Sequence, residues 1–357
     1  MIFHPSGQLR RIVVGVIAGL IFSTGAGTAL ARKFSDAVQR DVKYIIGLYY
    51  GNGENILIRE DGGELQLFYR LPGDRCFDAS NMYSLRKHRF DSYSMYEAGP
   101  MSHFGEVSVK FERDNDGYGV SLRVGGHVYT RMFFAGEKEG ELGMRLPPRG
   151  DWDDLRTAAK AASMPPALQR GAQEPLVNLA SVKGLKLVNV YGGSDNLFGA
   201  PLYAVNKLYL NRSAAAALAK AQGEVAKKGY GLVVWDAYRP WSVSKLANMA
   251  LPEKQKGMLE NPDTEGSPHN TGNAVDVGLY ELSTGEAVQM ISGFDEPSVR
   301  QYVRFPGGTA FQRSMRDWLR EVMENAGFTG VEHEWWHFHY NKGTEFAHLN
   351  IPLESLK

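Results

Sequence analysis

Residues 267–276 read Ser-Pro-His-Asn-Thr-Gly-Asn-Ala-Val-Asp and contain two side chains that commonly ligate zinc, His269 and Asp276. The segment between them, Asn-Thr-Gly at 270–272, is rich in turn residues, so a turn can bring the two side chains toward a single ion. By itself this pair is a weak indication of a metal site, because a capped turn with a paired aspartate has the same signature. The interpretation therefore depends on the segments that accompany it.

A second histidine-containing segment, residues 332–340, reads Glu-His-Glu-Trp-Trp-His-Phe-His-Tyr. It contains the pattern H-E-x-x-H, which on a helix places two histidines, here His333 and His337, on one face with Glu334 as the base of a zinc peptidase. The segment is aromatic and bounded by glycines, which favours a strand over a helix. In the alternative interpretation, His337 ligates the metal from a strand. Glu334 then precedes the strand or sits on a bulge, because residues three apart in a regular strand face opposite sides.

Four motifs in a fixed order resemble the D-Ala-D-Ala dipeptidases, the vancomycin-resistance type of zinc D,D-peptidase (peptidase family M15). Residues 191–199, Tyr-Gly-Gly-Ser-Asp-Asn-Leu-Phe-Gly, resemble the opening motif of that family, and residues 235–240, Trp-Asp-Ala-Tyr-Arg-Pro, resemble its strand end. The other two motifs are the segment 267–276 and Glu-Trp-Trp-His at 334–337. The resemblance covers about residues 180–345.

The resemblance implies a metal site and a catalytic pair. It implies one Zn²⁺ per chain, held by His269, Asp276 and His337. Three protein ligands leave a fourth position for water, whose pKa zinc lowers to ~7, so the expected reaction is hydrolysis by metal-activated water. Glu334 is then the general acid/base, and Arg239 steadies the scissile carbonyl and the oxyanion formed from it.

The resemblance also implies that Tyr191, Ser267 and Asp295 hold the free amine of the substrate. A carboxylate facing an ammonium restricts the substrates to those with a free N-terminus, which predicts a dipeptidase acting on D-Ala-D-Ala or related cell-wall dipeptides. A rival is a peptidoglycan D,D- or L,D-carboxypeptidase with the same zinc site and no need for a free amine. A third hypothesis, a non-catalytic zinc-containing binding module, is disfavoured because both Glu334 and Arg239 are present.

The whole chain predicts two folded parts. Residues 40–145 predict a small all-β, barrel-like accessory domain, because short runs of β-formers alternate with turn signals. The Pro- and Ala-rich residues 146–178 predict a linker. Residues 179–357 mix helices at 213–228 and 311–326 with isolated strands, which predicts an α+β catalytic domain. For that domain, the resemblance implies a hedgehog/D,D-peptidase-like fold, with an antiparallel sheet and flanking helices. The expected accessory strands are residues 44–50, 56–58, 65–69, 107–111, 120–124 and 128–134.

The N-terminal residues 1–31 have the pattern of a secretory signal peptide. Two arginines precede an apolar run at 12–22, and small residues lead to Ala-Leu-Ala at 29–31. We therefore expect a periplasmic or secreted protein, cleaved after Ala31. An uncleaved membrane anchor is the alternative, and the short apolar core disfavours it.

Composition limits the classes of partner. Lys plus Arg and Asp plus Glu are each 40, and the resulting zero net charge gives no electrostatic signature of nucleic acid or an anionic membrane. A single cysteine, Cys76, excludes an intrachain disulfide and a four-cysteine zinc site. The expected partner is a small dipeptide or cell-wall peptide, with membrane contact only through the signal peptide or an uncleaved anchor. The sequence predicts no particular oligomeric state.

Overall fold

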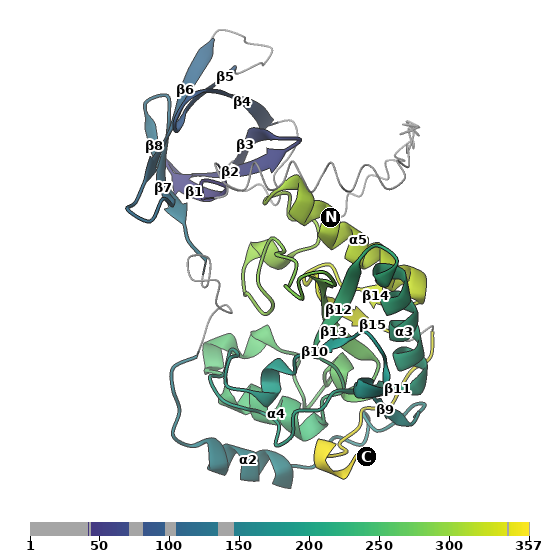
Figure 1. Cartoon of the computed structure of the whole chain (residues 1–357). Helices are drawn as coiled ribbons and strands as arrows, with labels where there is room; N and C mark the ends of the chain where they lie inside the picture. The colour runs from purple at the N-terminus through teal and green to yellow at the C-terminus, as the bar shows by residue number, and fades with distance from the viewer. Residues whose placement is uncertain are drawn as a thin grey trace, which may run out of the picture.

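A β-barrel is followed along the chain by an α+β domain (Figure 1). The predicted signal peptide lies outside the described residues. Among the described residues, no helix is long and apolar enough to cross a membrane. The computed structural model describes residues 42, 44–70, 81–96, 105–134, 146–340 and 343–356.

The barrel is closed by eight strands, each antiparallel to its neighbours, with β1 paired to β8. Closure pairs every strand on both sides, which removes the exposed sheet edges that promote aggregation. The predicted all-β, barrel-like domain is thus confirmed, and it has two strands, β4 and β5, that were not predicted. The strands are β1 (Gly47–Gly51), β2 (Glu54–Asp61), β3 (Glu64–Arg70), β4 (Met82–Arg89), β5 (Ser92–Tyr96), β6 (Glu106–Arg113), β7 (Gly119–Val124) and β8 (His127–Met132).

Strand β2 is buried on both faces. Ile56 and Ile58 point into the barrel core, whereas Leu57 between them packs in a second apolar cluster with Ile291 and Phe305 of the α+β domain. Successive strand residues face opposite sides, so this arrangement explains why the apolar run in β2 is uninterrupted. One outer face of the barrel therefore packs against the α+β domain.

The α+β domain is built on a five-stranded sheet in the order β10-β12-β13-β15-β14. The sheet is mixed, which corrects the predicted antiparallel arrangement. β10 runs parallel to β12, and the other neighbours are antiparallel. A parallel pair needs a crossover connection, and the helix α3 lies in the connection between β10 and β12. The strands are β10 (Lys186–Leu187), β12 (Tyr230–Asp236), β13 (Ala274–Glu281), β14 (Thr329–Gly330) and β15 (His337–His339).

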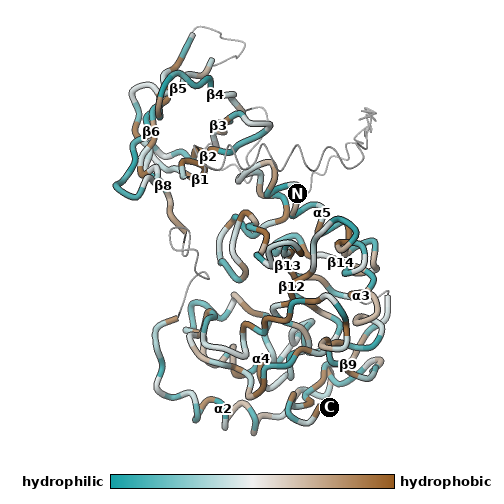
Figure 2. Tube along the Cα trace, viewed as in Figure 1, coloured by the Kyte–Doolittle hydropathy of each residue, from teal (hydrophilic) through white to brown (hydrophobic). Residues whose placement is uncertain are grey.

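The described part of the α+β domain contains four α-helices, of which α3 and α5 contact strands of this sheet. α3 packs against α5 and β12, and α2 packs against α4. α5 begins at a capping box formed by Thr309 and Gln312 and ends at Gly327, whose φ of 108° suits glycine. The central strands β12 and β13 are largely apolar along their length (Figure 2). The helices are α2 (Trp152–Ala161), α3 (Arg212–Ala226), α4 (Trp241–Ala250) and α5 (Ala310–Ala326), and the short 3₁₀ helices are Leu179–Ser181, Val190–Gly192, Glu253–Met258, Pro268–Thr271, Val299–Gln301 and Leu353–Ser355.

Residues 146–178, predicted as a linker, are packed against the α+β domain. The N–H of Leu146 donates to the carbonyl of Leu197, 2.7 Å away, and Ala159 of α2 is buried. Strand β9 (Leu176–Asn178) pairs with β11 (Tyr209–Asn211) in a two-stranded sheet. The proline-rich composition thus corresponds to a docked segment that contains α2 and β9, and not to a free tether.

Candidate metal centre and active site

Three buried side chains, those of His269, Asp276 and His337, converge beside the central sheet. Their ligand atoms all lie within 4.8 Å of one another. His337 Nδ1 is 2.9 Å from Asp276 Oδ1 and 3.2 Å from His269 Nε2, and His269 Nε2 is 3.4 Å from Asp276 Oδ2. Two imidazole nitrogens and a carboxylate that face one point form a donor set that fits zinc and leaves a coordination position open.

Strand pairing brings Asp276 and His337 together across a long stretch of chain. They are register partners in β13 and β15. His269 lies on the 3₁₀ helix Pro268–Thr271, which ends at Gly272 with a φ of 75°, so the predicted turn before Asp276 is present.

The segment before His337 is not helical. Residues 331–336 form bends and irregular backbone, and β15 begins at His337. The helical H-E-x-x-H interpretation is therefore wrong, and Glu334 precedes the strand as the alternative required. His333, the second histidine of the helical interpretation, is exposed.

The surroundings of His269 favour a positive charge. Its Nδ1–H donates to the carbonyl oxygen of Ala237, 2.7 Å away, which leaves Nε2 to face the other two ligands. Burial lowers the pKa of His269, but the carboxylates of Asp276 and Asp236 outweigh it and raise that pKa to about 9. Burial raises the pKa of Asp276, but the charge and hydrogen bond of His269 outweigh it and lower that pKa. Either a proton on His269 or a bound metal cation would supply the positive charge that these carboxylates favour.

Glu334 is a carboxyl group with no hydrogen-bond partner among the described residues. Burial raises the pKa of Glu334, and the negative charges of Asp276, Asp295 and Glu260 raise it further, to about 8. A partly buried acid that titrates near neutrality and has no structural partner has the properties of a general acid/base.

Asp236 holds Arg239 in place. Arg239 donates from both Nε and Nη2 to Asp236 Oδ2, and the hydroxyl of Tyr203 donates to Asp236 Oδ1, 2.9 Å away. The guanidinium lies 5.1 Å from the ring centroid of Tyr191. The hydroxyl of Tyr203 also lies within hydrogen-bond reach of the guanidinium.

Tyr191 and Asp295, two of the three residues predicted to hold the substrate amine, are in contact. The hydroxyl of Tyr191 donates to Asp295 Oδ2. Burial raises the pKa of Asp295 to about 7, against the hydrogen bond from Tyr191, which lowers it. Ser267 is buried two residues before His269, and in the described part of the chain no hydrogen bond joins it to this pair.

Aromatic rings line the same region. Phe294 stacks on Trp235 with centroids 4.9 Å apart and lies edge-on to Trp336 at 5.4 Å. Trp335 is buried, and its Nε1–H donates to Ser292 Oγ, 2.9 Å away. These rings pack around the polar groups and keep water from them, which strengthens electrostatic interactions in the site.

Two acidic residues near the site were not predicted to have a role. Asp236 lies in the motif that also contains Arg239. Its carboxylate is fully buried and accepts from Arg239, and the sequence alone does not show this burial. Glu260 is exposed, and its charge contributes to the raised pKa of Glu334. No sequence pattern marks Glu260, because it reaches the site through the path of the loop after α4.

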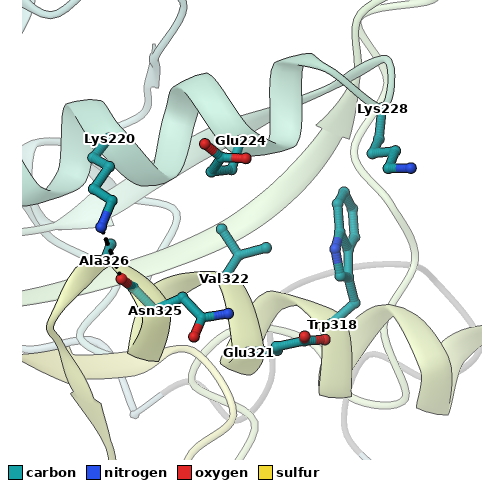
Figure 3. Close-up of a pocket in the computed structure, with 8 residues that line it drawn as sticks. All are labelled: Lys220, Glu224, Lys228, Trp318, Glu321, Val322, Asn325 and Ala326. Atoms are coloured by element: carbon teal, nitrogen blue, oxygen red, sulfur yellow. Dashed lines mark hydrogen bonds between the residues drawn. The ribbon is translucent and has the colours of Figure 1, made fainter. Parts of the chain in front are cut away.

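A cavity of about 320 Å³ lies between α3 and α5 (Figure 3). In it, Lys220 Nζ donates to the carbonyl oxygen of Asn325, 3.0 Å away. None of the predicted site residues contributes to it, so this cavity is separate from the candidate site. Its lining residues are Lys220, Glu224, Lys228, Trp318, Glu321, Val322, Asn325 and Ala326.

Sequence comparison identifies the family. A family model for the M15 peptidases, described as D-ala-D-ala dipeptidase, matches residues 173–351. The chain belongs to this family. The predicted D-Ala-D-Ala dipeptidase family is thereby confirmed.

Curated members of the D-Ala-D-Ala dipeptidase family match over most of their own length. The D-alanyl-D-alanine dipeptidase of Enterococcus faecalis is 35% identical over 166 residues, which cover 42% of this chain and 82% of that protein. The D-alanyl-D-alanine dipeptidase of Escherichia coli is 31% identical over 175 residues, which cover 49% of this chain and 89% of that protein.

Solved structures match this chain less well than the curated sequences do. The LdcB LD-carboxypeptidase is 19% identical, with a TM-score of 0.29 over 49% of this chain and 72% of that chain. A variant of the vancomycin-resistance D,D-pentapeptidase VanY in complex with Zn(II) is 17% identical, with a TM-score of 0.25 over 39% of this chain and 76% of that chain. These scores are too low to define the fold.

We predict that His337→Ala loses bound zinc and that His333→Ala keeps one ion per chain. Removing a ligand should weaken zinc binding by more than about 100-fold, since even the outer hydrogen bonds of metal ligands contribute 10–100-fold. Zinc content after gel filtration, measured by atomic emission, tests both variants. Zinc loss in His333→Ala together with retention in His337→Ala would contradict the ligand assignment.

Proposed function

We propose that this chain is a zinc-dependent dipeptidase that hydrolyses D-Ala-D-Ala or a closely related cell-wall dipeptide. One observation carries the proposal: Glu334 is close enough to both Asp276 and Asp295 for each carboxylate to raise its pKa. An acid/base thus lies near both a three-residue ligand set and a second acid able to hold an ammonium. This is the arrangement that hydrolysis of a short peptide with a free N-terminus requires.

The ligand set supports zinc as the cofactor. His269, Asp276 and His337 would hold one ion, since they are buried and offer two nitrogens and a carboxylate to one point. When bound, zinc supplies a Lewis acid that polarises a carbonyl and lowers the pKa of water. A bound cation also lowers the pKa of nearby Glu334, which favours the carboxylate that acts as a base.

Glu334 is the residue that transfers the proton during hydrolysis. Its carboxylate takes a proton from the attacking water and returns it to the nitrogen of the leaving amino acid. Because Glu334 has no hydrogen-bond partner among the described residues, its carboxyl oxygens are available for both transfers. A pKa near neutrality suits a group that must accept and then donate.

Arg239 stabilises the negative charge that forms on the carbonyl oxygen. Asp236 and the ring of Tyr191 fix its guanidinium, so little reorganisation is needed when the charge develops. Its charge is permanent, which suits it to an oxyanion.

Asp295 and Tyr191 select the substrate by its amine. Asp295 offers a carboxylate to an ammonium, and the hydroxyl of Tyr191 orients that carboxylate. A peptide with a blocked N-terminus leaves the buried charge of Asp295 without an ammonium beside it, which penalises its binding. This pair favours a dipeptidase over a D,D- or L,D-carboxypeptidase, which has no need of such a group. Ser267 is retained as a third amine-binding residue on the basis of the family motif alone.

The cellular setting and the finer fold are part of the same proposal. The pattern of residues 1–31 supports export to the periplasm or the medium, where cell-wall peptides occur. Family membership and the flanked central sheet support a hedgehog/D,D-peptidase-like catalytic domain. A small dipeptide or cell-wall peptide is the proposed partner.

A panel of defined peptides tests the function. We expect zinc-loaded protein to cleave D-Ala-D-Ala with a kcat/KM on the order of 100-fold or more above that for its N-acetylated form, because a site built for a polar group rejects analogues lacking it. L-Ala-L-Ala serves as the stereochemical control. Equal cleavage of the acetylated peptide would replace the dipeptidase with the carboxypeptidase.

Glu334→Gln should retain zinc and lose turnover. The amide cannot accept the proton, so we expect kcat to fall by roughly 10²–10⁴-fold. Glu332→Gln is the matched control, because Glu332 is an exposed residue of the same segment that pairs with Arg304 and Arg320. Undiminished kcat in Glu334→Gln, measured with zinc content on the same sample, would remove Glu334 from the mechanism.

The pH dependence should identify Asp295. Its pKa is raised to about 7, so below that pH the carboxyl is protonated and cannot pair with an ammonium. The kcat/KM of wild type divided by that of Asp295→Asn should therefore rise from about pH 6 to about pH 8, since kcat/KM follows groups of the free enzyme. Glu334 titrates in both proteins, but its pKa is lower in Asp295→Asn because the charge of Asp295 no longer raises it; this difference acts on the ratio in the same direction. A flat ratio over this range would exclude Asp295 as the amine-binding acid.

A further inference from the structure

The 291–309 loop, which joins the central region of the α+β domain to α5, contacts two parts of the site. It carries Asp295, and it also touches the segment that carries Glu334. The carbonyl of Gln301 accepts from the N–H of Trp335, and the N–H of Val303 donates to the carbonyl of Glu332, each at 3.1 Å. A shift of this loop therefore moves the amine-binding acid, whereas these two hydrogen bonds hold residues 301 and 303 to the segment of the general base.

The other side of the 291–309 loop rests on the barrel. Ile291 and Phe305 pack against Leu48, Leu57 and Phe68, which are the outward-facing residues of β1, β2 and β3. All five side chains are buried. The apolar contact therefore fixes the loop at two points, one on each side of Asp295.

Glu60 of β2 makes the polar part of this contact. It is 3% exposed, and its Oε2 accepts from the N–H of Ala310, the first residue of α5, at 2.8 Å. Its own N–H donates to the carbonyl of Gly308 at 3.1 Å. A carboxylate at a helix N-terminus complements the helix dipole and the unpaired N–H groups there. Arg313 of α5 donates back to the carbonyl of Glu60 and to Asp61, at 2.9 and 3.0 Å.

Asp295 needs such support. Its φ is 55°, a left-handed conformation that few residues other than glycine adopt, although aspartate adopts it more often than most. Strained backbone of this kind persists where surrounding contacts determine it. The family model covers residues 173–351, so the barrel that supplies the outer contacts lies outside the family's matched region.

We propose that the barrel holds the 291–309 loop in shape, and that Glu60 is a positioning residue that sets where Asp295 meets the substrate amine. This inference rests on the proposed dipeptidase function. It gives the barrel a role in substrate selection. Displacing a positioning group by about 1 Å is enough to cost on the order of 100-fold in rate. A loosened loop should therefore weaken the binding of free dipeptides while leaving the metal ligands on the sheet intact.

The test compares Glu60→Ala with Glu64→Ala in the zinc-loaded full chain. Glu64 lies on the same β2–β3 hairpin and is exposed, and it has no side-chain partner among the described residues. We expect Glu60→Ala to speed hydrogen exchange of amides in 291–309 and to raise KM for D-Ala-D-Ala by roughly tenfold with little change in kcat or zinc content. Glu64→Ala should match wild type. A loss of folded protein would instead lower kcat at unchanged KM.

Glu60→Gln is the second variant, for use if Glu60→Ala fails to fold. Its amide oxygen can still accept from the N–H of Ala310. It should give a smaller change of the same kind. Wild-type exchange and KM in a folded Glu60 variant would overturn the inference.

A double-mutant cycle shows whether Glu60 acts through Asp295. In an Asp295→Asn background, Glu60→Ala should no longer change kcat/KM for D-Ala-D-Ala. An undiminished effect in that background would overturn the role assigned to Glu60. If wild-type protein leaves D-Ala-D-Ala intact, the proposed function fails. The exchange measurement then decides by itself whether Glu60 holds the loop.

Discussion

A row of three polar residues across the central sheet organises the rest of the site. Asp236 of β12 is the register partner of Asp276 of β13, which in turn is the partner of His337 of β15. A slip of one residue in either pairing would turn a ligand to the opposite face of the sheet. Apolar neighbours such as Val275 and Val277 are fully buried and hold this register. The geometry of the metal centre is thus a consequence of strand pairing.

Burying two carboxylates in this row requires cations beside them. Asp236 has a permanent one, since Arg239 donates to it twice, and Tyr203 satisfies its other oxygen. Asp276 faces two imidazoles, which are neutral unless protonated. Leaving a buried charge without its partner costs about 3–5 kcal/mol, so the second carboxylate favours a bound cation. The electrostatics that position Arg239 and those that favour a metal therefore have the same origin.

Sequence reasoning found the candidate ligands that the fold brings together, while the roles of the site residues stay predictions. The ligand set and Glu334 lie within 267–276 and 334–337, and the local backbone of each segment is as predicted. Helices α3 and α5 were predicted to within one or two residues of their bounds, because both carry strong helix formers and glycine stops. These features depend on residues close together in the chain.

Features set by distant residues were not predicted. Strand β4 was missed because Leu85 is its one buried residue and its second half, from Arg86, is charged, so the alternation that marks a strand is weak. The docking of residues 146–178 was missed because proline-rich composition is the same in a docked segment and a free tether. The parallel pairing of β10 depends on the crossover through α3, which no local pattern encodes.

Among the described residues, the barrel contacts the loop that carries the proposed amine-binding residue and not the segments that carry the proposed metal ligands. The proposed metal ligands belong to the sheet and to the turn before β13, whereas Asp295 belongs to a loop held between the sheet and the barrel. The run Ile56-Leu57-Ile58 makes this attachment possible. Leu57 faces outward and packs on the loop, whereas Ile56 and Ile58 face inward and pack in the barrel core. Because successive strand residues face opposite sides, changes at the outward positions alter the loop contact and leave the barrel core in place. Such a chain can vary its substrate preference without disturbing the metal site.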